Sequence, residues 1–148
     1  MVFFTKSAIW LSFLLLSTVL FGQKGMGDAK GLSQLDSLPN LSVIEGVIKS
    51  VSTGPCELST GNSASGTHIW VLSNDELYNV HLGPTARIKN FVRKKTGQPL
   101  TATVFRTRKL PKNHYIAQKI KINGSELVLR DGYLKPFWAN KKCRAIWK

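Results

Sequence analysis

Residues 66–84 read GTHIWVLSNDELYNVHLGP, and the fold is decided by this stretch. Apolar and polar residues alternate on both sides of a polar turn, which is the pattern of a β-hairpin with one buried face. Residues 68–72 and 77–82 are therefore the predicted strands. A four-residue loop, 73–76, is expected to join them, since this is a common length for a hairpin connection.

A register that pairs Leu72 with Leu77 gives the hairpin two distinct faces. Its apolar face is expected to point into a core and consists of Ile69, Val71, Tyr78 and Val80. Its other face carries His68, Trp70, Asn79 and His81. Directly opposed residues have Cβ atoms roughly 4.5–5.5 Å apart, so the two imidazoles should be neighbours. A slip of one residue would move the apolar side chains out of the core.

Strand patterns rich in apolar and β-branched residues recur outside the hairpin, over residues 43–51, 100–108, 115–122 and 126–130. Gly46 inside the first of these strands indicates a bulge or a bend at a barrel corner. Asn123-Gly124, between the last two, is the strongest short hairpin signal in the chain. Residues 84–97 change to a helical period, with Pro84 near the start and Gly97 past the end.

The order of these elements predicts the fold class. It is a mostly β protein, a five-stranded OB-fold-like barrel with one helix between strands three and four and an extra C-terminal hairpin. The outer face of the second and third strands is the usual binding platform of that architecture. The residues of the opening hairpin are those two strands.

The domain is expected to span residues 41–148. The first 22 residues, MVFFTKSAIWLSFLLLSTVLFG, have the basic start and short apolar run of a secretory signal peptide, with an uncleaved membrane anchor as the alternative. Residues 23–40 are rich in glycine and serine and are predicted to be a flexible leader. We therefore expect a periplasmic or secreted protein.

Cys56 and Cys143 are the two cysteines of the sequence. An exported protein meets oxidising conditions, so a disulfide between them is one prediction. Two unpaired thiols are the alternative, because sequence does not show whether the two Cα atoms approach each other.

The formal net charge is +13, and it is unevenly distributed. Residues 23–80 carry three lysines against six acids, whereas residues 81–148 carry 17 lysines and arginines against Glu126 and Asp131. This asymmetry favours an anionic partner: nucleic acid, an acidic polysaccharide or a membrane surface. The alternative is a solvated basic surface that only keeps the protein soluble.

Three interpretations of the polar hairpin face stay open. In the first, Trp70 stacks on a ligand while cations hold its anionic groups; the predicted ligand-binding residues are Trp70, Asn79, Arg87, Lys89, Arg93, Arg106, Arg108, Lys119 and Lys121. In the second, His68 and His81 bind a transition metal, with a third ligand from His114, Asp75 or Cys56. In the third, residues 52–66 or the C-terminal tail cover this face, which then has only a packing role.

Catalysis is not expected from this sequence. It contains no Gly-x-Ser-x-Gly elbow and no phosphate-binding loop. Beyond residue 80 its carboxylates are Glu126 and Asp131, which leaves few groups for acid–base or metal-assisted chemistry. The sequence therefore predicts a binding protein.

Three stretches carry a resemblance: GTHIWV (66–71), VHLGP (80–84) and LVLRDGYLKPFW (127–138). They resemble small exported bacterial OB-fold proteins, with related domains in some magnetosome proteins and, more distantly, in the periplasmic BOF-type proteins. The resemblance covers about residues 43–138. This chain departs from the pattern where Gly132 directly follows Asp131, and it is more basic than the group. The resemblance implies an exported, non-enzymatic OB-fold module.

Two functional hypotheses follow from the sequence. The first is an exported OB-fold protein that binds an anionic polymer or surface. The second is a periplasmic accessory protein that binds a transition metal through His68 and His81.

Overall fold

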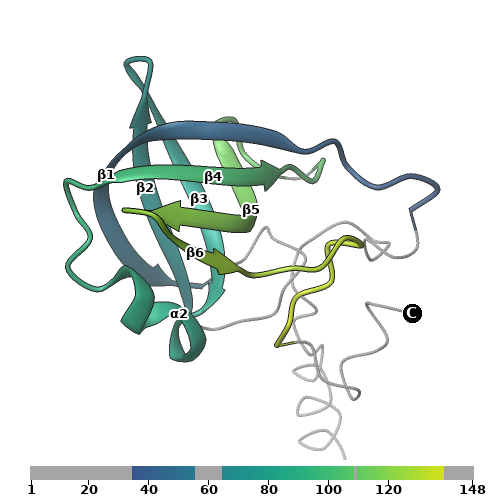
Figure 1. Cartoon of the computed structure of the whole chain (residues 1–148). Coiled ribbons are helices and arrows are strands. Elements are labelled where there is room, and N and C mark those ends of the chain that lie inside the picture. Colours follow the sequence, from purple (N-terminus) through teal and green to yellow (C-terminus); the bar gives the residue numbers. More distant parts are fainter. Residues whose placement is uncertain (1–34, 56–64, 109, 139–148) are drawn as a thin grey trace, which may run out of the picture.

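Strand β1, Ser42–Gly54, pairs with a different strand along each of its halves. The computed structural model of the chain describes residues 35–55, 65–108 and 110–138. Residues 42–47 pair with β4, Pro99–Phe105, and residues 47–54 pair with β2, Gly66–Ser73, both antiparallel. Figure 1 shows β1 curving around the barrel to reach both partners.

Gly46 lies where β1 passes from β4 to β2. A Cβ atom at this position would collide with the backbone carbonyl of Leu72 on β2. The close approach of the two backbones therefore requires glycine. The bulge of β1 lies between Ile48 and Ser50, beyond Gly46.

The hairpin of β2 and β3, Glu76–Pro84, has the predicted register. Its pairs include Leu72 with Leu77 and His68 with His81. The four-residue loop was wrong, because Ser73 pairs with Glu76 and only two residues form the turn. These are Asn74 and Asp75, with φ of 49° and 62°, the conformation of a type I′ turn that matches the twist of the two strands.

The barrel closes through β5, His114–Ile122, which pairs antiparallel with β4 and parallel with β3. The contact with β3 consists of the pairs Asn79–His114, Val80–Tyr115 and His81–Ile116. The sheet order β3-β2-β1-β4-β5 thus returns to β3. The predicted class, a mostly β five-stranded barrel of OB-fold-like topology with a helix after the third strand, is confirmed.

Helix α2, Thr85–Val92, is shorter than predicted, since Gly97 was expected just past its end. Ile88 and Val92 are buried against the barrel, as expected for the apolar face. Past Val92 the chain becomes extended at Arg93. The backbone of Gly97 and Gln98 then bonds to that of Ile48, so tertiary pairing with β1 replaces the last helical turns.

Strand β6, Ser125–Val128, forms the predicted extra hairpin with β5. Asn123 and Gly124 have φ of 49° and 80°, so this turn is again of the type I′ kind. The predicted strand 126–130 extends too far, because the amides of Leu129 and Arg130 both bond to the carbonyl of Gln118. The predicted strand 100–108 likewise ends early, at Phe105.

Arg130 completes the closure of the barrel next to the short β3–β5 contact. Its guanidinium donates hydrogen bonds to the carbonyl of Leu82 on β3, at 3.4 Å, and to that of Ala117 on β5. It also lies 5.8 Å from the ring centroid of Phe105 and 5.1 Å from that of Trp138. Arg130 therefore joins the two strands beyond their last paired residues.

The core has two parts. The barrel interior is filled by aliphatic side chains, among them the fully buried Ile48, Ile69, Val71, Val80 and Ile120. A smaller cluster lies outside the barrel interior. Ile116 pairs with His81 and points to the same outer side of the sheet. The buried residues of this cluster are Phe105, Leu110, Ile116 and Leu134. Leu35, within the predicted leader, packs against this second cluster.

Two sequence predictions fall outside the described residues. These are the signal peptide, residues 1–22, and the pairing of Cys56 with Cys143. Within the described ranges, no helix has the length and apolar character needed to span a membrane.

Candidate functional site

The outer face of the hairpin carries the four side chains that the register assigned to it. His68 lies opposite His81 and Trp70 lies opposite Asn79. The two imidazoles contact each other edge to face, with ring centroids 4.4 Å apart. The predicted neighbourhood of the two histidines is therefore confirmed.

Burial divides these four residues. His68, Asn79 and His81 are only 8%, 5% and 7% exposed, whereas Trp70 is half-buried. The two histidines and the asparagine are thus packed, whereas most of the residues that the third interpretation expected to cover this face lie outside the described residues. The side chain that this face offers to a ligand is that of Trp70.

A third histidine joins the face from another strand. His114 begins β5 and pairs with Asn79, which brings its ring to 5.8 Å from that of Trp70 and 5.3 Å from that of His81. Its Nδ1 lies 3.1 Å from Nε2 of His81, at hydrogen-bonding distance. The sequence suggested His114 only as a metal ligand; its contact with Trp70 depends on a parallel pairing between distant strands.

Both histidines of this hydrogen bond are neutral at neutral pH. Burial lowers the pKa of His81 to about 3, and the charges of His68, His114 and Arg130 act in the same direction. Burial also lowers the pKa of His114, with further contributions from His68 and Arg106. Each ring therefore has one N–H donor and one acceptor nitrogen.

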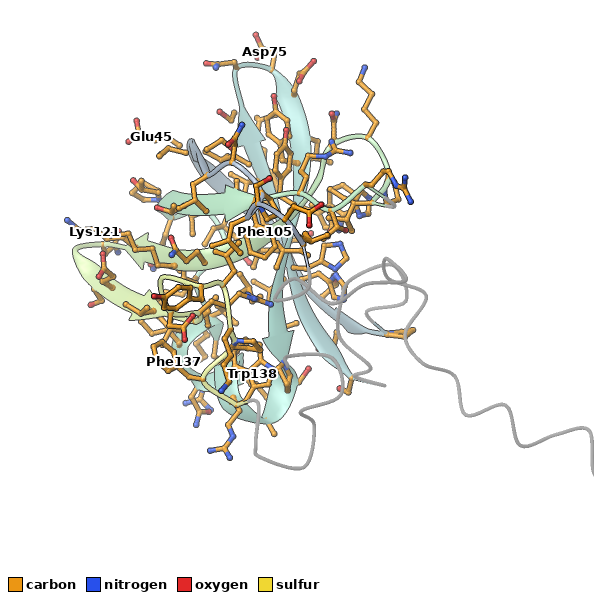
Figure 2. All side chains as sticks on the ribbon, turned by 90° about the vertical axis from the view of Figure 1, so that its right-hand side faces the viewer. Glu45, Asp75, Phe105, Lys121, Phe137 and Trp138 are labelled. Carbon is orange, nitrogen blue, oxygen red and sulfur yellow. The ribbon has the colours of Figure 1, made fainter. Side chains whose placement is uncertain are left out.

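The described residues do not assemble a metal site of the expected kind. No three or more His, Cys, Asp or Glu side chains within 35–55, 65–108 and 110–138 are placed to hold a metal ion. Nε2 of His68 lies 3.4 Å from the carbonyl oxygen of Gly54. Asp75 stands at the tip of the hairpin (Figure 2), and Cys56 is outside the described residues. Metal binding by His68 and His81 stays a prediction.

The segment between β4 and β5, residues 106–113, is rich in cations and leads directly into His114. We call it the basic connector. Arg106 donates hydrogen bonds to the carbonyls of Leu110 and Pro111, at 3.1 and 3.0 Å, which joins the start of the connector to these two residues. The exposed cations described within it are Arg108 and Lys112.

Two aromatic side chains, Tyr115 and Tyr78, follow Arg106 of the connector in a row of contacts. The guanidinium of Arg106 lies 5.3 Å from the ring centroid of Tyr115, and Tyr115 contacts Tyr78 edge to face at 5.7 Å. The hydroxyl of Tyr78 donates a hydrogen bond of 2.6 Å to Glu76. Positive charge and aromatic surface are thus adjacent at the start of β5.

The predicted cations lie in three separate places. Arg87 and Lys89 are exposed on α2, and Arg93 follows it, at the end of the barrel away from the β2–β3 turn (Figure 1). Lys119 forms an ion pair of 3.2 Å with Glu126 on β6. Figure 2 shows Lys121 at the far end of β5. Of the predicted cations, Arg106 and Arg108 are those of the basic connector.

Comparisons of the chain with protein-family models, with characterised proteins and with solved structures found no match. The resemblance to small exported OB-fold proteins is therefore supported at the level of the barrel alone.

Proposed function

We propose that this protein is an exported, non-enzymatic binding protein that holds single-stranded nucleic acid on the outer face of β2 and β3. One observation carries the proposal: the half-buried Trp70 contacts His114, the residue that follows the basic connector. Bases stack on such aromatic rings, and neighbouring lysines and arginines neutralise the phosphates. The two requirements for binding a single strand are thus met within one region.

The charges around this region favour a polymer over a membrane surface as the ligand. Two exposed carboxylates, Asp75 and Glu76, lie at the turn of the same hairpin. A broad anionic bilayer would meet these acids together with the connector cations. A single strand is narrow enough to contact Trp70 and the connector alone.

The two carboxylates of residues 81–148, Glu126 and Asp131, already have structural partners, which supports a binding role over catalysis. Glu126 is paired with Lys119, and Asp131 Oδ1 accepts hydrogen bonds from the backbone N–H groups of Tyr133 and Lys135. Both acids therefore have partners within the described structure. Export is supported by the signal-peptide pattern of the first 22 residues.

Fluorescence anisotropy with a labelled oligothymidylate tests the proposal. We expect affinity to fall linearly on a log–log plot as salt rises from 50 to 200 mM, because phosphate contacts release counterions. Trp70→Ala should weaken binding by about 5- to 150-fold, the effect of losing one stacked base. Arg108→Ala should reduce the salt slope by about one.

Lys121→Ala is the matched control, since Lys121 is an exposed cation at the far end of β5 (Figure 2). It should leave the affinity for the oligonucleotide nearly unchanged. A sulfated polysaccharide and anionic vesicles are measured in parallel. The proposal would be overturned if the protein bound the polysaccharide or the vesicles tightly and did not bind the oligonucleotide. It would also be overturned if Lys121→Ala and Arg108→Ala weakened oligonucleotide binding equally.

A further inference from the structure

The hydrogen bond between His81 and His114 has a direction that the surroundings of His81 determine. Nδ1 of His81 is buried and has no hydrogen-bond partner among the described residues. A neutral imidazole must place its single proton on Nδ1 or on Nε2. Buried N–H groups without a partner are rarer in proteins than unpaired acceptors. His81 therefore holds its proton on Nε2 and donates it to Nδ1 of His114, 3.1 Å away.

This direction fixes the tautomer of His114. Its Nδ1 accepts from His81, so a neutral His114 must carry its own proton on Nε2. The ring is half-buried, and no group within 35–55, 65–108 and 110–138 bonds to this second nitrogen. The lowered pKa of His114 keeps the ring in this neutral form near pH 7.

We propose that Nε2–H of His114 donates a hydrogen bond to the ligand held on Trp70, and that His81 is the positioning residue that fixes this donor. The inference rests on the proposed function and deepens it. The ring of His114 is nearly perpendicular to the indole, at 83°, with centroids 5.8 Å apart. A base stacked on Trp70 thus has a polar neighbour at one side.

The donor defines the chemistry that is recognised. The group opposite Nε2 must be an acceptor, such as a base carbonyl or a phosphate oxygen. A fixed donor does not have to reorient when the ligand arrives, so little conformational freedom is lost on binding. Trp70 supplies stacking that tolerates any base, and His114 adds a directional contact.

The first measurement is nitrogen NMR of the full chain with labelled histidines. We expect both His81 and His114 to show the neutral tautomer with the proton on Nε2. Adding oligothymidylate should shift the Nε2–H signal of His114 and leave the tautomer of His81 unchanged. A proton on Nδ1 of His114 in the free protein would overturn the inference, and this readout needs no substitution.

The second measurement is the affinity of histidine variants for the same oligonucleotide. His114→Leu removes the donor and should weaken binding by about 2- to 10-fold, the strength of one hydrogen bond. His114→Gln retains an N–H donor and should recover part of this loss. His81→Leu should give mixed tautomers of His114 together with a smaller loss of affinity.

The two proposals fail in different ways. If Trp70→Ala weakens binding but His114→Leu binds like the unchanged protein, the donor role of His114 is wrong and the binding face stands. If the unchanged protein does not bind the oligonucleotide at all, the proposed function and the donor role are both wrong. The NMR tautomers then still decide whether His81 orients His114.

Discussion

His81 keeps a neutral imidazole inside the protein, and this has a consequence for stability. Burial and the charges around the ring lower its pKa from 6.5 to about 3. Between these two pH values the unfolded chain binds a proton at this residue and the folded protein does not. The stabilising effect of the neutral ring is therefore complete above pH 6.5 and is lost as the pH falls toward 3.

We predict that the free energy of unfolding falls by about 1.4 kcal/mol per pH unit below pH 6.5 through His81 alone. Urea unfolding at pH 7, 6 and 5 measures this slope. His81→Leu removes the titrating ring and should flatten the slope over that range, whatever its stability at pH 7. Equal slopes for the variant and the unchanged protein would show that His81 does not cause the loss.

Sequence patterns placed individual residues well where the cause was local. Strict alternation along residues 68–72 and 77–82 put His68 opposite His81, and the structure has that pair. Burial of the two rings stayed one of three open interpretations. His81 meets His114 through a parallel contact between strands distant in sequence, and no local pattern encodes that contact.

Among the elements, β1 depends on a single glycine. Gly46→Ala would place a methyl group against the carbonyl of Leu72, where two paired strands leave no space. We predict a loss of about 1–3 kcal/mol in the free energy of unfolding, the usual effect of overpacking. Chemical denaturation of the variant measures it.

Gly132→Ala is the control for this prediction. No atom lies within 4 Å of the Cβ position at Gly132, so its substitution should change stability by less than about 0.5 kcal/mol. A similar loss from both variants would mean that the loss at Gly46 does not come from the contact with β2.

Turns and helix ends show where element boundaries escape a sequence pattern. Asn123-Gly124 was read correctly because glycine accepts a positive φ without strain. The turn at Asn74 and Asp75 adopts similar angles without glycine, whereas a four-residue loop was expected because that length is common. Helix α2 stops at Val92 because the following backbone bonds to β1, a partner that helical periodicity does not reveal.

At the scale of the whole molecule, the closure of the barrel depends on Arg130. Three residue pairs join β3 to β5, and Arg130 adds hydrogen bonds to one carbonyl of each strand. Arg130→Met keeps a long side chain at this position but removes the hydrogen-bond donors. We predict a loss of about 1.5–3 kcal/mol for each bond, since the donor is charged.

Hydrogen exchange locates this effect. In Arg130→Met the amides of β3 and of the first half of β5 should exchange faster than those of the β1–β4 ladder. Lys135→Met, an exposed position close in sequence, serves as the control and should leave both rates unchanged. Uniformly faster exchange in Arg130→Met would indicate a general loss of stability instead of a local opening between β3 and β5.

The barrel class was predictable as a whole, whereas the position of its charge was not. The order of the strands along the chain, the helix after the third strand and the extra hairpin all followed from patterns local to each segment. The predicted cations were assigned to one binding surface from the sequence, but they lie in separate places in the structure. The closed barrel separates Arg87 on α2 and Lys121 on β5 from Arg106 beside His114.

The double pairing of β1 also affects when the protein can fold during its synthesis. Ser42 meets Val104, and Val80 meets Tyr115, so the first strands find their last partners only after most of the chain has left the ribosome. Folds dominated by such distant pairings form slowly, in milliseconds to seconds. Until then the nascent polypeptide lacks a closed barrel, as the proposed export of the protein would require.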